Sequence, residues 1–412
     1  MITFPKRKII IIGGSIGGLF SAIFLRRKGF DVEVFERADG LSDRGAGIAT
    51  QKSLHDVLAK AEVVRPDGTG VEIDGRIMFA SDGKVLGTHD MDQIMTSWGL
   101  VHRSLLERIP NDCYHNSKSM VSLEQDAENV YATFEDGTIV EGDFLIGADG
   151  TWSSTRQCVN PEAKVDYCGY FIWRGLIDEM LIPRDVFGQV SRRLTFGMAP
   201  GGHWLGYLVA GSDDDLTVGR RRFNWAWYRP GTEEFLRELL TDEKGVYHQY
   251  GIPHGLVQKK YRNAMREEAK RRLAPQLQEI IMATETPFLQ PIYEYMSERM
   301  LFGRVALVGD AAFTARPHVA VGVSKAAEDA LALSEALSCS EPNVGLRKFE
   351  RDRTELGRAI ARWGQDLGSY CGTPAKDEAT QKKALYYQRP EVLLSVTAAT
   401  DPSAYYLDER KI

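Results

Sequence analysis

The fold of this chain is decided by the stretch KRKIIIIGGSIGGLF, residues 6–20. The unbroken apolar run over 9–12 predicts that residues 6–12 form a buried parallel strand, because a strand covered on both faces lacks alternation. The glycines that follow predict a tight turn into a helix over 17–28, which Gly29 ends. Alternation over 32–36 predicts a second strand. The start of the chain therefore reads as a βαβ unit.

The glycine turn has the chemistry of a dinucleotide site. Gly13 permits the sharp turn, Gly18 lets helix and strand approach, and free N–H groups at the helix start can hold a pyrophosphate. Glu36 lies 18 residues beyond Gly18, where a carboxylate accepts hydrogen bonds from ribose hydroxyls. Ser15 replaces the middle glycine of G-x-G-x-x-G, and the alternative is a purely structural turn. The candidate contacts are Gly13, Gly14, Ser15, Ile16, Gly18, Glu36 and Arg37.

Composition narrows the class of protein. The chain has 412 residues, enough for two domains, with 43% hydrophobic and 26% charged residues. A net charge of −6 argues against a nucleic-acid-binding face, and no apolar run is long enough to span a membrane. The five cysteines lack metal-ligand spacing, so we expect no metal site and a cytoplasmic location with reduced thiols.

Two further glycine-and-carboxylate signatures follow apolar runs. The second signature of the chain is GADGTWSSTR over 147–156. The third is GDAA over 309–312, followed by Pro317 and Gly322. Such sites spread along one chain suggest a long cofactor touched by distant segments.

The second and third signatures resemble those of the single-component flavoprotein aromatic hydroxylases. Residues 147–156 fit that family's G-A-D-G-x-x-S-x-x-R motif, and residues 309–330 are similar to its G-D motif. The segment 102–106 looks like its Arg-x-x-Leu flavin contact, and 44–48 resembles its glycine segment near the isoalloxazine ring. The resemblance implies FAD as cofactor, with further contacts from Arg44, Arg103, Asp149, Asp310, Pro317, Val321 and Gly322.

The resemblance also implies roles for several of these residues. Asp310 would accept a hydrogen bond from the ribityl chain, and the helix start at Gly322 would stabilise negative charge at the N1–C2 edge of the reduced ring. Arg103 would meet the pyrophosphate or ribityl region, and Asp149 would lie near flavin and nicotinamide. Departures at Phe313, Ala320 and Ser324 make the third motif most similar to the 2,6-dihydroxypyridine 3-hydroxylase branch.

The implied architecture is α/β, with a Rossmann-like FAD-binding domain and a second, mostly β-sheet substrate domain, like para-hydroxybenzoate hydroxylase. We expect a discontinuous FAD domain over 1–75, 100–165 and 295–370, and a substrate domain over 76–99 and 166–294. Residues 371–412 form a C-terminal tail of uncertain structure. A single helix is expected over 263–282.

The implied reaction is hydroxylation of a hydroxypyridine or phenol with NADH or NADPH and O₂, through a flavin C4a-hydroperoxide. Oxidative decarboxylation or epoxidation would use the same machinery. A flavin-dependent dehydrogenase or reductase that inserts no oxygen remains an alternative, as does a flavin-binding protein without catalysis. The small aromatic substrate and O₂ are the expected partners, and a homodimer is possible.

Three residues are candidates for orienting or deprotonating the substrate. His203 and Tyr207 share one face of a predicted strand, and His318 follows Pro317 in the flavin segment. The alternatives are a core or surface histidine, a tyrosine packed in a sheet, and a loop histidine that only shapes the pocket. Phe223, Trp225 and Trp227 alternate and are expected as core, with Trp173 and Tyr207 as candidate pocket walls.

Overall fold

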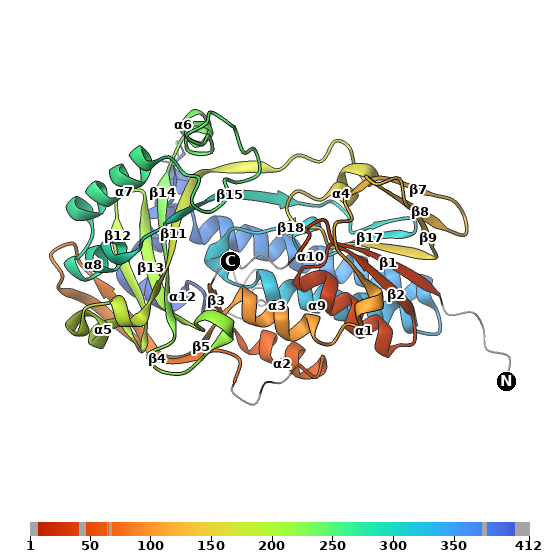
Figure 1. Cartoon of the computed structure of the whole chain (residues 1–412), viewed down its shortest axis with the longest axis horizontal. Coiled ribbons are helices and arrows are strands. Elements are labelled where there is room, and N and C mark those ends of the chain that lie inside the picture. Colours follow the sequence, from red (N-terminus) through yellow and green to blue (C-terminus); the bar gives the residue numbers. More distant parts are fainter. Residues whose placement is uncertain (1–6, 41–46, 64, 66–67, 373–376, 400–412) are drawn as a thin grey trace.

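Two β-sheet units lie side by side along the long axis of the molecule (Figure 1). The computed structural model describes residues 7–40, 47–63, 65, 68–372 and 377–399. One unit is a mainly parallel sheet of six strands, and the other is a mainly antiparallel sheet of nine strands. This mixed α/β architecture confirms the fold class expected from the sequence.

The six-stranded sheet has the order β16-β17-β10-β1-β2-β6. Its strands are β1 (Lys8–Ile12), β2 (Asp31–Phe35), β6 (Tyr114–His115), β10 (Phe144–Gly147), β16 (Leu301–Phe302) and β17 (Val305–Leu307). Strands β1, β2, β10 and β17 run parallel, so segments about three hundred residues apart meet in one sheet. The three sequence signatures follow β1, β10 and β17, and parallel strands bring all three turns to the same sheet edge.

Helices cover this sheet and form its hydrophobic core. They are α1 (Ile16–Arg27), α2 (Lys52–Lys60), α3 (Trp98–Leu106), α4 (Ser154–Val159), α9 (Gly322–Ser338) and α10 (Pro342–Leu367). Leu19 of α1 and Leu333 of α9 are fully buried in one cluster with Ile11 of β1. A separate meander of β7 (Met120–Gln125), β8 (Val130–Phe134) and β9 (Ile139–Gly142) lies beside the sheet.

The nine-stranded sheet has the order β18-β15-β11-β14-β13-β12-β4-β5-β3. Its strands are β3 (Gly47–Ala49), β4 (Val71–Phe79), β5 (Val85–Ser97), β11 (Asp166–Asp178), β12 (Arg193–Ala199), β13 (Gly202–Val209), β14 (Arg222–Pro230), β15 (Phe288–Met296) and β18 (Phe313–Thr314). Strand β4 begins before the expected domain boundary at residue 75, and β3 joins this sheet although it lies within the expected FAD segment.

The two faces of this sheet have different partners. On the outer face Phe223, Trp225 and Trp227 pack together, as alternation predicted, beneath α7 (Lys259–Arg272) and α8 (Pro275–Ala283). Trp173 lies in the same core, so its expected place as a pocket wall is wrong. The opposite face carries His203, Tyr207 and Tyr228 towards the FAD-binding unit. Strand pairing register thus separates core aromatics from site aromatics.

The expected helix over 263–282 is two helices. The first ends at Arg272, and the second begins at Pro275. Proline lacks an N–H and clashes with the preceding helical turn, so it is favoured at the start of a helix and breaks a longer one. None of the described helices is long and apolar enough to cross a membrane.

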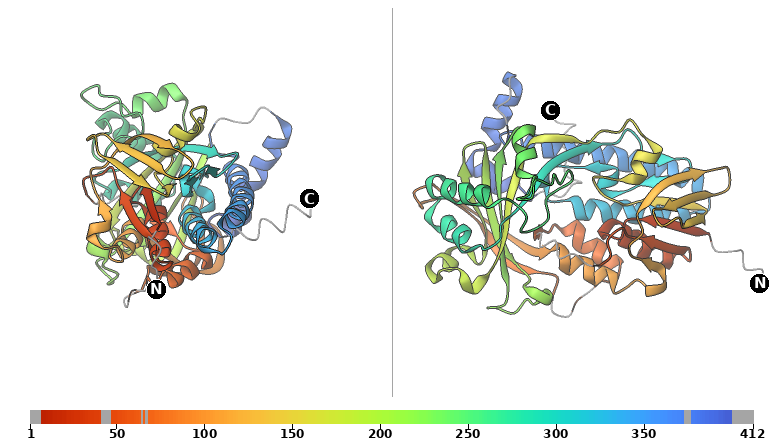
Figure 2. Two further views of the ribbon diagram at one scale, coloured as in Figure 1. Left: turned by 90° about the vertical axis from the view of Figure 1, so that its right-hand side faces the viewer. Right: turned by 45° about the horizontal axis from the view of Figure 1, so that its top comes forward.

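The chain beyond α10 returns to the nine-stranded sheet. It contains α11 (Glu378–Tyr387) and α12 (Pro390–Val396), and Figure 2 shows this blue segment on the side that holds the larger sheet. The guanidinium of Arg76 on β4 donates to the carbonyls of Leu394, Thr397 and Ala398 at the end of α12. Ala398 N–H in turn donates to the His318 carbonyl at 3.0 Å. A buried arginine therefore anchors the C-terminal segment beside a candidate site residue.

Replacing Arg76 with methionine is expected to release this segment. The side chain of Arg76 is fully buried, so its loss leaves the helix-end carbonyls without their donors. The expected destabilisation is about 2–4 kcal/mol, from several lost charged hydrogen bonds. Limited proteolysis should cut near α12 faster in the variant, and thermal unfolding should begin earlier. Unchanged cleavage and stability would contradict the anchoring role. The control is Arg192→Met, an exposed position in the turn just before the neighbouring strand β12.

Candidate active site

The turn after β1 is built so that only glycine fits. Gly13 has a φ of +104°, and a Cβ there would lie 2.5 Å from the Ala148 carbonyl oxygen. A Cβ on Gly18 would lie 1.9 Å from the Gly13 carbonyl oxygen. Strand β1, the turn after β10 and helix α1 therefore touch backbone to backbone. Such contact leaves the helix start accessible to a phosphate group.

The N-terminus of α1 keeps its N–H groups available. Ser15 is the N-cap residue, but its side chain forms no capping hydrogen bond, and the first turn from Ile16 has no acidic residue. Gly14 N–H donates to Glu36 Oε2 at 2.7 Å. Glu36 Oε1 accepts from Ala38 N–H, which fixes the carboxylate beside the turn. Lone pairs remain on both oxygens for ribose hydroxyls.

The turn after β17 presents a carboxylate with no protein donor. Asp310 is exposed, and no hydrogen bond to its carboxylate is seen within the described residues. Surrounding protein nevertheless raises the pKa of this carboxyl by desolvation, which Lys325 partly offsets. An exposed but desolvated group lies in a concave part of the surface. This is the environment expected for the ribityl contact.

A buried ion cluster holds this turn against α9. Lys325 Nζ donates to the Gly309 carbonyl at 3.0 Å and to Asp329 Oδ2 at 2.8 Å. The same Asp329 oxygen accepts from Gly309 N–H at 3.0 Å, and Asp329 Oδ1 accepts from Arg353 Nε at 2.7 Å. The sequence pointed to the Glu328-Asp329-Ala330 segment but not to Lys325 or Arg353. Together they hold the backbone of Gly309, the residue before Asp310.

The N-terminus of α9 faces open space. Gly322 is its first residue, and a Cβ there would meet no atom within 4 Å. Val321, the N-cap residue, is fully buried and makes no side-chain cap. Pro317 begins the short helix η5 (Pro317–Val319) just before it. The free N–H groups can therefore meet the electron-rich edge of a ring.

Ala320, which stands where the family motif has a glycine, keeps the backbone conformation that glycine favours. Its φ is +54°, a left-handed conformation that costs about 1 kcal/mol for any residue other than glycine. The family's glycine at this position matches that geometry. The chain keeps the conformation with alanine, so the loop shape is retained at some cost in stability.

The middle signature is mainly structural in this structure. Asp149 accepts from Ser153 Oγ at 2.5 Å and from Thr155 N–H at 2.9 Å, which caps the start of α4. Arg156 donates to the Ala311 carbonyl at 3.0 Å and lies over the Tyr295 ring. The second signature therefore ties the turn after β10 to the turn after β17.

The arginines expected at the cofactor behave differently. Arg103 Nε donates to Asp214 Oδ2 at 2.7 Å, so its guanidinium is already paired with an aspartate of the sheet unit. Arg37 is exposed. Arg44 lies outside the described residues. A contact of Arg103 with the cofactor remains a prediction.

These features form a cradle that fits FAD. Along one edge of the sheet lie the glycine turn at the start of α1 and the fixed carboxylate of Glu36. The unpaired carboxylate of Asp310 and the open N-terminus of α9 follow. The N–H groups at the start of α1 would donate to phosphate oxygens, and the carboxylates of Glu36 and Asp310 would accept from sugar and ribityl hydroxyls.

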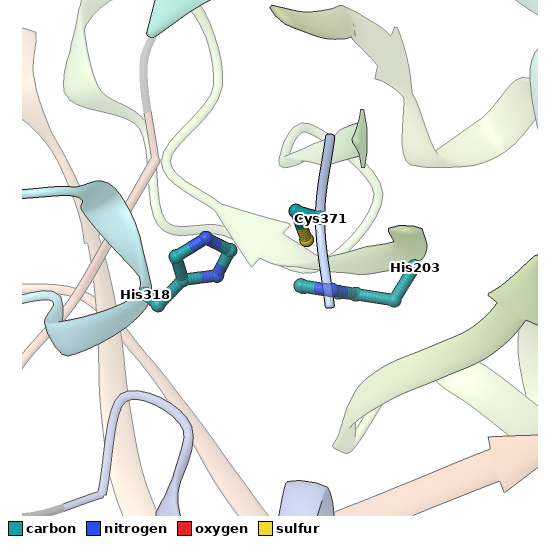
Figure 3. A group of neighbouring side chains, drawn as sticks. All are labelled: His203, His318 and Cys371. Carbon is teal, nitrogen blue, oxygen red and sulfur yellow. The ribbon is translucent and has the colours of Figure 1, made fainter. Parts of the chain in front are cut away.

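The candidate histidines meet in one cluster on the inner sheet face. Figure 3 shows His203, His318 and Cys371 converging from three separate segments. Tyr370 Oη lies 2.8 Å from His203 Nδ1, and Tyr170 Oη lies 2.9 Å from His318 Nε2. Within the described chain, His203 Nε2 and His318 Nδ1 are buried without a partner.

One aromatic ring links the two histidines. Tyr228 stacks on His203 with ring centroids 4.3 Å apart and on His318 with centroids 4.7 Å apart. The cluster is therefore flat, aromatic and uncharged, with one polar nitrogen left over on each imidazole. Flat walls with few polar groups are typical of a pocket for an aromatic ligand.

Burial keeps both histidines neutral. It lowers the pKa of His203 to about 3 and the pKa of His318 well below its ordinary value. Their candidate ligand atoms and that of Cys371 lie within 4.8 Å of one another. Burial also raises the pKa of the Cys371 thiol, whereas metal ligation needs the thiolate. We therefore interpret the cluster as a hydrogen-bonding surface.

Tyr207 lies on the same sheet face as His203 but belongs to a second group of polar side chains. Four extended residues span about 13 Å, so Tyr207 and His203 cannot both contact one hydroxyl group. Burial raises the pKa of Tyr207 to about 12, which makes its hydroxyl a donor. Its cross-strand partner is Asn224.

Several residues of the site were not predicted from the sequence. They are Tyr170, Arg174, Asn224, Tyr228, Tyr370 and Cys371. Alternation along 170–174 and 224–228 could have placed four of them on one face, but only the strand register puts that face beside His203. No local signal marks Tyr370 and Cys371, which follow a helix and reach the site through tertiary packing.

Comparison with known proteins defines the class. Residues 6–168 and 243–363 match the family described as FAD binding domain, and residues 167–294 match one described as FAD binding domain-like. The chain belongs to this family of FAD-dependent aromatic monooxygenases, which confirms FAD as the cofactor.

Individual relatives narrow the branch. A 2,6-dihydroxypyridine 3-monooxygenase of Paenarthrobacter nicotinovorans is 32% identical, covering 85% of this chain and 88% of the relative. A 6-methylsalicylate 1-monooxygenase of Aspergillus terreus is 29% identical, covering 81% and 75%. The solved 2,6-dihydroxypyridine-3-hydroxylase of Arthrobacter nicotinovorans superimposes with a TM-score of 0.84 at 29% identity, covering 92% and 96%. The similarity to the dihydroxypyridine branch expected from the sequence is thereby confirmed.

Proposed function

We propose that this enzyme hydroxylates a hydroxypyridine-type ring, with NADH or NADPH as the reductant and O₂ as the oxygen source. The observation that carries the substrate class is the flat, neutral imidazole–tyrosine cluster beside Pro317 and Gly322. Its flat aromatic surface and unpartnered ring nitrogens suit a planar heteroaromatic ring with hydrogen-bonding groups at its edge. Relatives acting on dihydroxypyridine, urate and methylsalicylate support the reaction type.

The residues of the cradle have distinct roles in this proposal. Bound FAD supplies the electron transfer and oxygen activation. Gly13, Gly14, Ser15, Ile16 and Gly18 hold its pyrophosphate at the α1 N-terminus, and Glu36 holds the ribose. Asp310 accepts from the ribityl chain, and Val321 and Gly322 present N–H groups to the ring edge. Arg37, Arg44, Arg103, Asp149 and Pro317 complete the candidate set.

The substrate side is formed by the inner sheet face. His203 and His318 direct one nitrogen each to the ring, and Tyr370 and Tyr170 fix the orientation of the two imidazoles. Buried aromatic walls exclude water from the site of oxygen transfer. Burial lowers the pKa of both histidines and so makes them weak bases, which favours a role in orienting the ring over removal of its proton.

Product analysis tests the reaction. Purified holoenzyme is mixed with 2,6-dihydroxypyridine and NADH or NADPH, and O₂ uptake and product mass are measured. We expect substrate-stimulated O₂ uptake and a product heavier by one oxygen atom, labelled from ¹⁸O₂. Nicotinamide oxidation without a labelled product would favour a dehydrogenase or reductase instead, and loss of CO₂ from a carboxylated ring would favour decarboxylative hydroxylation.

His203→Gln is expected to slow hydroxylation about 10- to 100-fold, because one positioning hydrogen bond to the ring is weakened. Its pH profile between 6 and 9 should keep the wild-type shape, since His203 does not titrate there. Steady-state kinetics at several pH values provide the measurement. Loss of a pH limb would instead identify His203 as the base, and unchanged turnover would remove it from the site. Exposed His89→Gln is the control.

The proposal also covers the oligomeric state and the cellular location of the enzyme, and it includes both NADH and NADPH as reductants. We propose a homodimer in the cytoplasm, from the family habit and the reduced cysteines. Light scattering of the purified protein gives the mass in solution, and a monomeric mass would exclude the dimer.

A further inference from the structure

Arg174 on β11 is a half-buried cation that has no carboxylate partner among the described residues. Its guanidinium donates to Gln290 Oε1 at 2.8 Å and to Asn224 Oδ1 at 3.3 Å, and both acceptors are neutral amides. Its Nε is buried and has no partner among the described residues. No carboxylate of the described chain pairs with it, whereas Arg316 pairs with Glu294 and Arg229 with Glu268.

An uncompensated charge inside a protein is costly. Buried arginines are ordinarily paired with a carboxylate that offsets the lost hydration. Neutral amides satisfy some of the N–H groups of Arg174 but do not cancel its charge. The remaining charge and the free Nε–H suit an anion that arrives from outside the protein.

Asn224 extends this donor set. It is fully buried, and its Oδ1 accepts from Arg174 and, at 3.2 Å, from Gly47 N–H. That arrangement leaves Nδ2 as a buried donor without a partner. The amide therefore presents N–H to the site.

Tyr207 adds a hydroxyl on the neighbouring strand. It lies opposite Asn224 in the register of β13 and β14. The positive charge of Arg174 acts on Tyr207 and Tyr228, opposing the rise that burial causes in the pKa of each hydroxyl. Arg174 is thus within electrostatic reach of both rings. Donors dominate the group, and donor-rich cationic groups bind oxyanions.

The group lies against the glycine segment. A Cβ on Gly47 would come within 2.7 Å of Asn224 Nδ2 and 2.8 Å of the Tyr207 ring. The sequence resemblance places this segment near the isoalloxazine ring. The neutral His203–His318 cluster occupies the same sheet face, with His203 four residues from Tyr207 along β13.

We propose that Arg174, with Asn224 and Tyr207, binds an anionic ring oxygen of the substrate, so that the enzyme selects ionised hydroxy-heteroaromatic rings. This inference rests on the proposed function and adds the charge state of its substrate. The ring loses its hydroxyl proton to solvent on binding, and the guanidinium replaces the hydration of the oxygen. An ionised ring is richer in electrons, which favours attack on an electrophilic oxygen. No side-chain base is then needed, in agreement with two neutral histidines.

Equilibrium binding to the holoenzyme tests this assignment. The probes are 2,6-dihydroxypyridine and its non-ionisable ether 2,6-dimethoxypyridine, with resorcinol and 1,3-dimethoxybenzene as a second pair. Binding is followed through the flavin absorbance, and the ultraviolet spectrum of the bound probe reports its ionisation. The wild type should prefer the ionisable member of a pair and bind it as the anion. Arg174→Met should reduce that preference about 10- to 100-fold, and Arg174→Lys should restore part of it.

Control variants separate charge from folding. Arg229→Met removes a half-buried arginine from the outer face of the same sheet, where Glu268 already pairs with it, and should leave the preference unchanged. If Arg174→Met does not fold, Arg174→Gln retains neutral hydrogen bonding and serves the same comparison. A wild-type preference in the Arg174 variant, or a neutral bound ring in the wild type, would overturn the proposal. Binding and oxygenation of resorcinol instead of the pyridine would reject only the proposed substrate.

Discussion

Gly18→Ala is expected to yield a protein that no longer retains FAD. The added methyl group would lie 1.9 Å from the Gly13 carbonyl oxygen, so helix α1 must move away from β1. Forced overpacking costs about 1–3 kcal/mol or more, and the shift also displaces the N–H groups that hold the pyrophosphate. The ratio of flavin to protein absorbance and a titration of apoprotein with FAD provide the measurements. We expect FAD affinity to fall about tenfold or more, since a factor of ten corresponds to about 1.4 kcal/mol, within that range.

A matched glycine isolates the effect of the turn. Gly188→Ala lies in α5 (Arg184–Val190), where a Cβ would meet no atom within 4 Å. Alanine favours an exposed helix by about 1 kcal/mol, so this control should keep its FAD and gain slightly in stability. Full FAD affinity in Gly18→Ala would show that the backbone contact is not required for the cofactor.

Asp329→Asn is expected to cause the largest loss of stability. The carboxylate is fully buried and joins Lys325, Arg353 and the Gly309 N–H. An amide there removes the carboxylate partner of Lys325 and leaves Arg353 paired with Glu328 alone. Breaking a buried ion cluster by removing one partner costs about 3–5 kcal/mol. Denaturant unfolding measures the loss, and FAD release should accompany it because Asp310 follows Gly309. The control Asp352→Asn weakens surface pairs with Lys348 and Arg351 and should cost about 0–1 kcal/mol.

The effect of Asp329 should depend on pH in a defined direction. Burial by itself would raise the pKa of this carboxyl, but Lys325 and Arg353 outweigh it and the pKa is lowered. The stabilisation is therefore complete above the unfolded-state pKa of about 3.9 and declines as the pH falls below it. The difference between wild type and Asp329→Asn should be largest near neutral pH and shrink in acid. A difference that grows in acid would contradict the assignment.

Local patterns were sufficient for the cofactor half of the molecule. The turn from Gly13 to Gly18 and the carboxylate Glu36 belong to one continuous βαβ unit, so their geometry follows from short-range sterics. The same holds for the start of α9 at Gly322, which was expected at the residue where it begins. The one clear local error, the helix split at Pro275, also has a local cause.

The substrate half depended on register. Alternation placed Trp225 and Trp227 on one face of a strand, but it could not say which face is covered by α7 and α8. That choice decides which of two adjacent residues lies in the core and which in the site: Trp173 is a core residue, and Arg174 is a site residue. Successive side chains of a strand point to opposite faces, so a single register decides both.

The opening stretch of residues 6–20 thus indicated a dinucleotide site by itself, because a glycine turn between strand and helix is specified within a few residues. Only the tertiary structure decided what stands opposite the flavin. Strands β11, β13 and β14, the loop at His318 and the segment at Tyr370 meet through contacts between residues about 150 positions apart or more, such as Tyr170 with His318 and Tyr370 with His203. Packing free energy selects such contacts for the molecule as a whole, and no local pattern encodes them.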